Sequence, residues 1–226
     1  MYWLRPGPGR NYIDATVGLG GHARGILERS SPDGLLLALD VDAQALVYAR
    51  QALSDFGSRV VFVRGRHVDL AAIARQNGFS QVDGVLLDLG VSSLQLGDSA
   101  RGFSFQEDGP LDMRMGDQEL TAAEIVNTWP EGELARILYE YGEERRARRV
   151  ARAICAGRPW RSTLELAAVV ARVVGYAGRI HPATRTFQAL RIAVNGELAS
   201  LQSVLPQSLD ILAPGGRLVV ISFHSL

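Results

Sequence analysis

The glycine-rich stretch at residues 12–22 carries residue types that can bind a nucleotide-like cofactor. A short apolar run is followed by three glycines, where the backbone can turn sharply or approach a ligand: Gly18, Gly20 and Gly21. Asp40 comes about twenty positions later, at the end of the next apolar run, where a carboxylate can accept hydrogen bonds from both ribose hydroxyls. The spacing favours the looser loop of S-adenosylmethionine enzymes over a dinucleotide fingerprint. A tight turn with no ligand is the alternative.

The elements that position these residues follow from the apolar pattern. Strands alternate with helical segments over the first ninety residues, which predicts an α/β Rossmann-like fold with a parallel sheet and right-handed crossovers. The predicted strands are residues 12–15, 35–39, 59–63, 82–88 and 217–222. Ligands of such sheets bind beyond the carboxyl ends of the strands. Asp40 and His67 follow predicted strands and Asp88 ends one, so these three are candidate site residues.

The alternation stops after residue 97. Residues 98–116 are irregular, and helices follow, one of them with an apolar stripe through Leu134, Ile137, Leu138 and Tyr141. We therefore expect residues 98–180 to form an all-helical insertion and residues 1–97 and 181–226 to form the sheet domain, with one long helix at 182–205. A sheet that ends on its fifth strand leaves an open edge, so we expect the chain to be truncated.

Composition places the chain among soluble globular proteins and predicts a cytoplasmic location. The chain has 226 residues, of which 47% are hydrophobic and 21% charged, and no apolar run is long enough to span a membrane. One cysteine excludes an internal disulfide, and the four histidines are scattered, so no metal site is expected. The net charge of zero does not indicate a nucleic-acid partner, although every basic residue is arginine.

Six stretches carry a resemblance to one family: residues 12–22, 83–93, 101–105, 108–115, 181–195 and 222–225. The chain resembles the S-adenosylmethionine-dependent small-subunit rRNA (cytosine-N4)-methyltransferase H family. The resemblance implies a class I methyltransferase fold with a helical domain inserted after the fourth strand. It also implies methylation at N4 of one cytidine in the decoding region of 16S rRNA, on an assembled or nearly assembled small subunit, with S-adenosyl-L-methionine as the cofactor.

The sequence departs from this family in four places. Family members begin with a His-Ile-Pro-Val-Leu-type segment and continue past the Ser222–Ser225 stretch with a basic tail, so the chain is expected to be truncated at both ends. His67 stands where the family usually has an aromatic residue, and Leu94 where it often has proline.

The resemblance implies a set of cofactor-binding residues: Gly20, Gly21, His22, Asp40, His67, Asp88 and Gln95. The glycines and His22 would face the methionine end, Asp40 would hold the ribose, and His67 would stack on adenine or cap its edge. For Asp40 the alternative is a helix cap for the segment after it. For His22 the alternative is a polar residue in the first turn of a helix, and for His67 it is a surface histidine.

The methyl acceptor sets the expected catalytic residues. The N4 lone pair of cytosine is delocalised into the ring, so acceptors on its N–H bonds favour attack, and the base must leave its stack. The implied catalytic residues are Asp88, Ser92, Ser93, Asp112 and His224. Phe103 and Phe105 could stack on the base; the alternative is that they anchor the insertion to the sheet domain.

Arginines are the expected RNA contacts: Arg114, Arg145, Arg146 and Arg149. A salt-bridged helix face, with glutamates at 140, 143 and 144, is the alternative for the run at 145–152. Two other functions remain open: a non-catalytic, cofactor-binding ribosome-assembly factor, and a methyltransferase that acts on DNA or a small molecule.

Overall fold

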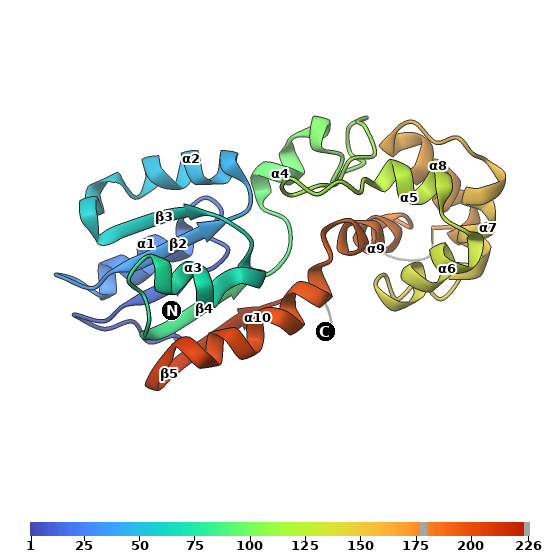
Figure 1. Cartoon of the computed structure of the whole chain (residues 1–226). Helices are drawn as coiled ribbons and strands as arrows, with labels where there is room; N and C mark the ends of the chain where they lie inside the picture. The colour runs from blue at the N-terminus through green and yellow to red at the C-terminus, as the bar shows by residue number, and fades with distance from the viewer. Residues whose placement is uncertain (177–179, 224–226) are drawn as a thin grey trace. The chain divides into compact units, whose positions relative to one another are not determined.

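The computed structural model describes residues 1–176 and 180–223, which divide into two compact units (Figure 1). The first, called here the sheet unit, consists of Met1–Ser92 and the chain from Leu198 onward. The second, called the helical unit, consists of Ser93–Glu197. None of the helices in the described ranges is long and apolar enough to cross a membrane.

Within the described residues, the sheet unit contains five parallel strands in the order β3-β2-β1-β4-β5. Their bounds are β1 (Tyr12–Asp14), β2 (Leu36–Asp40), β3 (Val60–Arg64), β4 (Val82–Asp88) and β5 (Leu212–Ile221). The predicted α/β fold with its parallel sheet is confirmed. The chain runs outward from β1 to β3 and then crosses to β4 on the other side of β1. The order in which the chain adds strands therefore reverses between β1 and β4. Open α/β sheets bind their ligands at such a switch point.

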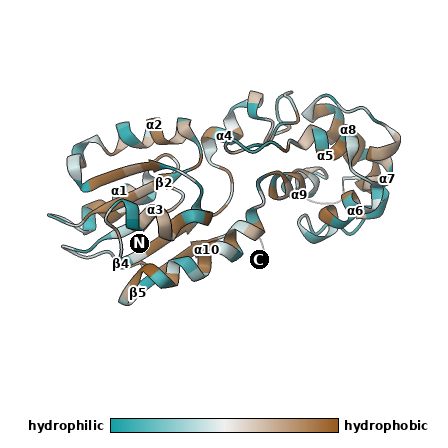
Figure 2. Cartoon of the chain, in the orientation of Figure 1, coloured by the Kyte–Doolittle hydropathy of each residue, from teal (hydrophilic) through white to brown (hydrophobic). Residues whose placement is uncertain are grey.

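Helices cover both faces of this sheet, because alternate strand residues point to opposite sides. Leu36 and Ala38 pack on one face with α1 (Gly21–Arg29) and α2 (Ala43–Ala52), whereas Leu37 and Leu39 pack on the other. The second face is covered by α3 (Leu70–Gln76) and α10 (Glu197–Ile211). Figure 2 shows the apolar residues concentrated in the strands and on the inner sides of these helices. Short 3₁₀ turns, η1 (Ser54–Arg59) and η2 (His67–Asp69), flank β3.

The helical unit starts with α4 (Ser93–Gly97) and the 3₁₀ turn η3 (Ser99–Arg101), followed by an irregular loop. The helices that follow are α5 (Ala122–Thr128), α6 (Glu131–Glu140), α7 (Ala147–Ala156), α8 (Thr163–Val174) and α9 (Thr184–Asn195). The apolar stripe predicted for α6 faces the interior, since Leu134, Ile137 and Leu138 are buried.

The region after residue 181 differs from the expectation in two ways. The predicted single helix over 182–205 is wrong, because Gly196 adopts a left-handed conformation (φ 60°) that ends α9 before α10 begins. In addition, α9 packs against α5 and α6 and belongs to the helical unit, not to the sheet domain as expected. The buried side chains of Phe187, Leu190 and Ile192 account for this placement.

Gly102 offers a test of how tightly the irregular loop of the helical unit is held. Its φ is +70°, and a Cβ there would lie 2.0 Å from the carbonyl oxygen of Pro110. Gly102→Ala should lower the free energy of unfolding by about 2–4 kcal/mol, because the backbone has to move. Gly132 lies in α6, and a Cβ added there would have open space around it. Gly132→Ala should therefore be neutral or stabilising by up to about 1 kcal/mol. Equal urea midpoints for the two variants would contradict this account of the loop.

Candidate functional site

Three carboxylates meet at the carboxyl edge of the sheet. Asp14 ends β1, Asp40 ends β2 and Asp88 ends β4, and these three strands are neighbours. Asp40 and Asp88 were predicted from the sequence, whereas Asp14 was missed. The clustering follows from topology, since parallel strands place their carboxyl ends on the same edge.

The glycine loop after β1 is held by Asp40. Its Oδ2 accepts the Gly18 N–H at 2.8 Å, and its Oδ1 accepts the Asp42 N–H at 2.9 Å. The helix-cap alternative for Asp40 does not hold, because the cap of α2 is the Asp42 side chain, which accepts the Gln44 N–H at 3.0 Å. Gly20, with φ 87°, precedes α1, and Gly21 is the first residue of that helix. Asp40 therefore fixes the loop that both glycines belong to.

Thr16 links β1 to β4. Its hydroxyl oxygen accepts the Asp88 N–H at 2.7 Å, and its own N–H donates to Asp14 Oδ1 at 3.3 Å. His22, in the first turn of α1, places its Nε2 3.3 Å from Asp88 Oδ2. Its side chain is 44% exposed, so it lies between Asp88 and solvent. Together these contacts position Asp88 from both sides.

Burial controls the charge on this edge. Desolvation raises the pKa of Asp14 from about 3.8 to about 7; the Thr16 N–H opposes this, and the negative charges of Asp40 and Asp88 add to it. Burial also raises the pKa of Asp40, against the hydrogen bonds from the Asp42 and Gly18 amides. These shifts limit how much negative charge the edge carries near neutral pH.

His67 opens η2, just after β3. Burial lowers its pKa, with a smaller contribution from the positive charge of Arg66, so the neutral imidazole is favoured. Three buried polar atoms of the sheet unit have no hydrogen-bond partner among the described residues: His67 Nε2, Asp14 Oδ2 and Asp88 Oδ1. Buried polar atoms normally have partners, so these three are candidates for contact with a ligand.

The other predicted residues near Asp88 in sequence are divided between the units. Ser92 is the last residue of the first part of the sheet unit, and Ser93 is the first residue of the helical unit and of α4. Gln95 is buried within α4. His224 lies outside the described residues. In the described ranges, no group of three or more His, Cys, Asp or Glu side chains is placed to bind a metal ion.

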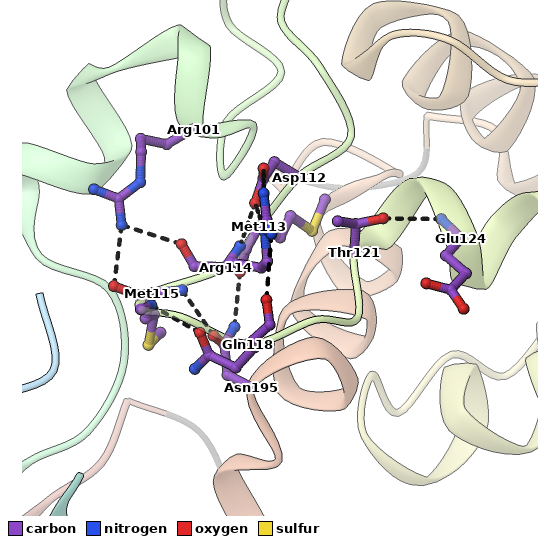
Figure 3. Close-up of polar contacts among 10 residues, drawn as sticks. Arg101, Asp112, Met113, Arg114, Met115, Gln118, Thr121, Glu124 and Asn195 are labelled. Atoms are coloured by element: carbon purple, nitrogen blue, oxygen red, sulfur yellow. Dashed lines mark hydrogen bonds and ion pairs between the residues drawn. The ribbon is translucent and has the colours of Figure 1, made fainter. Parts of the chain in front are cut away.

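Asp112 and Arg114 lie in the irregular loop and bind each other (Figure 3). Arg114 Nε donates to Asp112 Oδ1 at 2.9 Å and Nη2 donates to Oδ2 at 2.7 Å, and this ion pair lowers the pKa of Asp112. Asn195 anchors the same loop, donating to the Met113 carbonyl and accepting the Met115 N–H. Asp112 and Arg114 therefore have a structural role. The predicted roles of Asp112 in catalysis and of Arg114 in RNA binding stay predictions.

The two phenylalanines pack inside the helical unit. Phe105 contacts Phe187 and His181, each with ring centroids 4.7 Å away, and Phe103 is 7% exposed. The packing of the two phenylalanines anchors the irregular loop within the helical unit. A role in base stacking is not needed to explain their positions.

The predicted arginine run is exposed at the start of α7. Arg146 Nη1 donates to the carbonyls of Val173 and Val174, at the end of α8. Glu140 pairs with Arg136 at 2.8 Å, so this glutamate serves α6 and not the run. Glu144 is buried, and its carboxylate accepts the Arg146 backbone N–H.

Comparison with known proteins identifies the family of the chain. A family model described as the MraW methylase family matches residues 1–226. The chain belongs to the MraW methylase family. Proteins named "Ribosomal RNA small subunit methyltransferase H" are similar to it: one from Dehalococcoides mccartyi (52% identity, 97% of this chain), one from Syntrophotalea carbinolica (55%, 99%) and one from Thermomicrobium roseum (54%, 100%). The chain spans 63%, 73% and 71% of these relatives, respectively.

Within this MraW-family chain, Asp14 and Thr16 are the site residues that sequence reasoning missed. Asp14 interrupts the apolar run of the first strand, and a carboxylate inside a buried strand was a usable signal. Thr16 had no comparable signal, because its link to Asp88 joins positions 72 residues apart.

Asp14 gives a pH test of the site. The folded form holds the Asp14 proton more tightly than the unfolded form, so its stabilising contribution is complete below about pH 4 and is lost as the pH rises through about 7. Asp14→Asn should remove this dependence. Its free energy of unfolding should gain on wild type between about pH 4 and pH 7, by at most roughly 4 kcal/mol. The exposed Asp33→Asn is the control. Parallel stability curves for wild type and Asp14→Asn would show that folding does not raise the pKa of Asp14.

Proposed function

We propose that this chain transfers a methyl group from S-adenosyl-L-methionine to the exocyclic N4 of a cytidine in the decoding region of small-subunit rRNA. The observation that carries the proposal is the cluster of Asp14, Asp40 and Asp88 at the strand edge of a chain whose relatives are named as rRNA small subunit methyltransferases. The expected acceptor is the assembled or nearly assembled subunit, which places the protein in the cytoplasm.

The residues at the strand edge fit S-adenosyl-L-methionine, which has ribose hydroxyls, an ammonium group and an adenine ring. Carboxylate oxygens suit the hydroxyls and the ammonium group, and the unpartnered His67 Nε2 suits the polar edge of adenine. Gly20 and Gly21 keep the start of α1 free of side chains that would cover the loop amides. The cofactor supplies an electrophilic methyl group on a sulfonium, a chemistry that needs no metal.

In this proposal Asp40 holds the ribose while it keeps its hydrogen bonds to the loop amides, because each carboxylate oxygen has a second lone pair. The partly protonated Asp14 limits repulsion beside it. The glycine loop and His22 line the methionine end. The predicted cofactor contact of Gln95 stays a prediction.

Asp88 is the proposed acceptor for the cytidine amine. Its Oδ1 is free to accept an N4–H hydrogen bond, which shifts electron density toward the nitrogen and favours attack on the methyl group. After transfer the nitrogen loses a proton, and Asp88 can take it. His22, bound to the other oxygen and half exposed, gives that proton a way to solvent. Ser92 and Ser93 orient the base.

The prediction for Asp88 separates chemistry from cofactor binding. Asp88→Asn should lower the rate of methyl transfer by about 100-fold or more, because the amide cannot take the proton. Cofactor affinity, measured by calorimetry, should change by less than about tenfold, since the backbone contacts to Thr16 remain. Asp210→Asn, an exposed carboxylate paired with Arg75 on the sheet unit, is the control.

The assay uses labelled S-adenosyl-L-methionine and small subunits from cells that lack the modification, with free rRNA and DNA beside them and nucleoside mass analysis after digestion. N4-methylcytidine in the subunits, lost in Asp88→Asn, supports the proposal. Labelling of DNA alone would favour the DNA methyltransferase. Cofactor binding with no labelled acceptor would favour the assembly factor.

A further inference from the structure

The helical unit contains a basic groove between α6 and the start of α7, of about 770 Å³. This volume is within the range of roughly 300–1,000 Å³ that is typical of ligand sites. The groove is lined by small residues and by charged ones, with one aromatic side chain: Glu131, Gly132, Ala135, Arg136, Tyr139, Arg145, Arg146, Ala147, Arg148 and Arg149. None of these residues belongs to the proposed catalytic edge of the sheet unit.

The five arginines of this groove do not all have the same environment. Arg136 is held by Glu133 and Glu140, at 3.0 and 2.8 Å. Arg146 binds the carbonyls at the carboxyl end of α8, a favourable place for a cation. The guanidinium groups of the remaining three make no hydrogen bond or ion pair with any residue in the described ranges: Arg145, Arg148 and Arg149.

The position of these three arginines does not stabilise α7. They stand at or just before the first turn of α7, where the helix dipole is positive and cations are unfavourable, and that turn contains no acidic residue. Arg148 and Arg149 are exposed, on the side of α7 that faces away from its buried residues Val150 and Ile154. A site that binds an anion explains the same arrangement, because the free guanidinium groups would pair with it.

Tyr139 narrows the class of anion. It belongs to α6, is 66% exposed, and lines the same groove as the free arginines. An exposed aromatic ring beside planar guanidinium groups suits a nucleic-acid strand, whose bases stack and whose phosphates pair with arginine. Ala135 and Gly132, one and two turns before Tyr139 on α6, leave open space next to the ring.

We propose that this groove binds a single-stranded RNA segment, with a base stacked on Tyr139 and the flanking phosphates on Arg145, Arg148 and Arg149. The identity of the RNA rests on the proposed function, whereas the groove itself does not. The proposal also changes the expected RNA contacts: Arg148 and Tyr139 are added, and Arg146 is assigned to holding the end of α8.

The test is the anisotropy of a labelled, unstructured RNA of about a dozen nucleotides, titrated with the full chain at several salt concentrations. Tyr139→Ala should weaken binding by about tenfold, and Tyr139→Phe, which keeps the ring, by less than about twofold. The double variant Arg148→Gln/Arg149→Gln should weaken binding by at least about tenfold. It should also reduce the slope of log affinity against log salt by about 1.4, for two lost phosphate contacts.

The matched control is Arg161→Gln/Arg172→Gln, which removes the same charge from exposed positions of the helical unit outside the groove. It should bind RNA within about twofold of wild type. Equal losses in the two double variants, or unchanged binding by Tyr139→Ala, would overturn the proposal. So would polyglutamate displacing the RNA at equal charge concentration, because the groove would then be a general acidic-peptide site. Thermal melts of each variant exclude unfolding as the cause.

Cofactor binding and methyl transfer, measured on the same variants, keep the two proposals apart. If the groove variants lose RNA binding while no acceptor is methylated by wild type, the groove stands and the proposed reaction fails. If N4-methylcytidine forms normally in the groove variants and their RNA affinity is unchanged, the groove proposal fails and the reaction stands.

Discussion

The gathering of three carboxylates at one strand edge, with desolvation of Asp14 and Asp40, is the constraint on which the sheet unit depends. Parallel strands bring Asp14, Asp40 and Asp88 to one edge, and a buried carboxylate without compensation costs several kcal/mol. The molecule compensates each one differently. Asp40 receives two backbone N–H groups, Asp88 has His22 beside it, and Asp14 takes up a proton near neutral pH. The hydrogen bonds that compensate Asp40 also order the glycine loop, so the shape of the site follows from the need to compensate this carboxylate.

Sequence patterns predicted the sheet well because burial on both faces leaves continuous apolar runs in the strands. They predicted the boundary of the helical unit poorly. Helical periodicity continues on both sides of Gly196, and a single glycine within a helical pattern does not by itself show where the chain changes units. The fold of α9 onto α5 and α6 is a tertiary preference of Phe187, Leu190 and Ile192, which a local pattern does not reveal.

Candidate site residues were predictable where a side chain stands out from its local pattern, as Asp40 does at the end of an apolar run. Partners across the fold were not. The assignment of Asp40 depended on finding that Asp42 caps α2, and the hydrogen bond from the Asp88 N–H to Thr16 joins two distant segments. The same limit applies to Arg114: its type and loop position suggested RNA, yet both its Nε and its Nη2 are engaged by Asp112.

The ion pairs around the groove also explain how a chain with zero net charge can bind RNA. Equal numbers of acidic and basic residues suggest no nucleic-acid partner if the charges are averaged over the surface. In the groove they are not averaged, because the acidic residues of α6 already form ion pairs: Glu133 and Glu140 with Arg136, and Glu131 with Arg152 at 3.5 Å. Among the residues that the structure describes, three guanidinium groups remain unpaired beside an exposed tyrosine. Phosphate attraction is local, screened beyond about 8–10 Å, so this residual charge, and not the total, determines where RNA can bind.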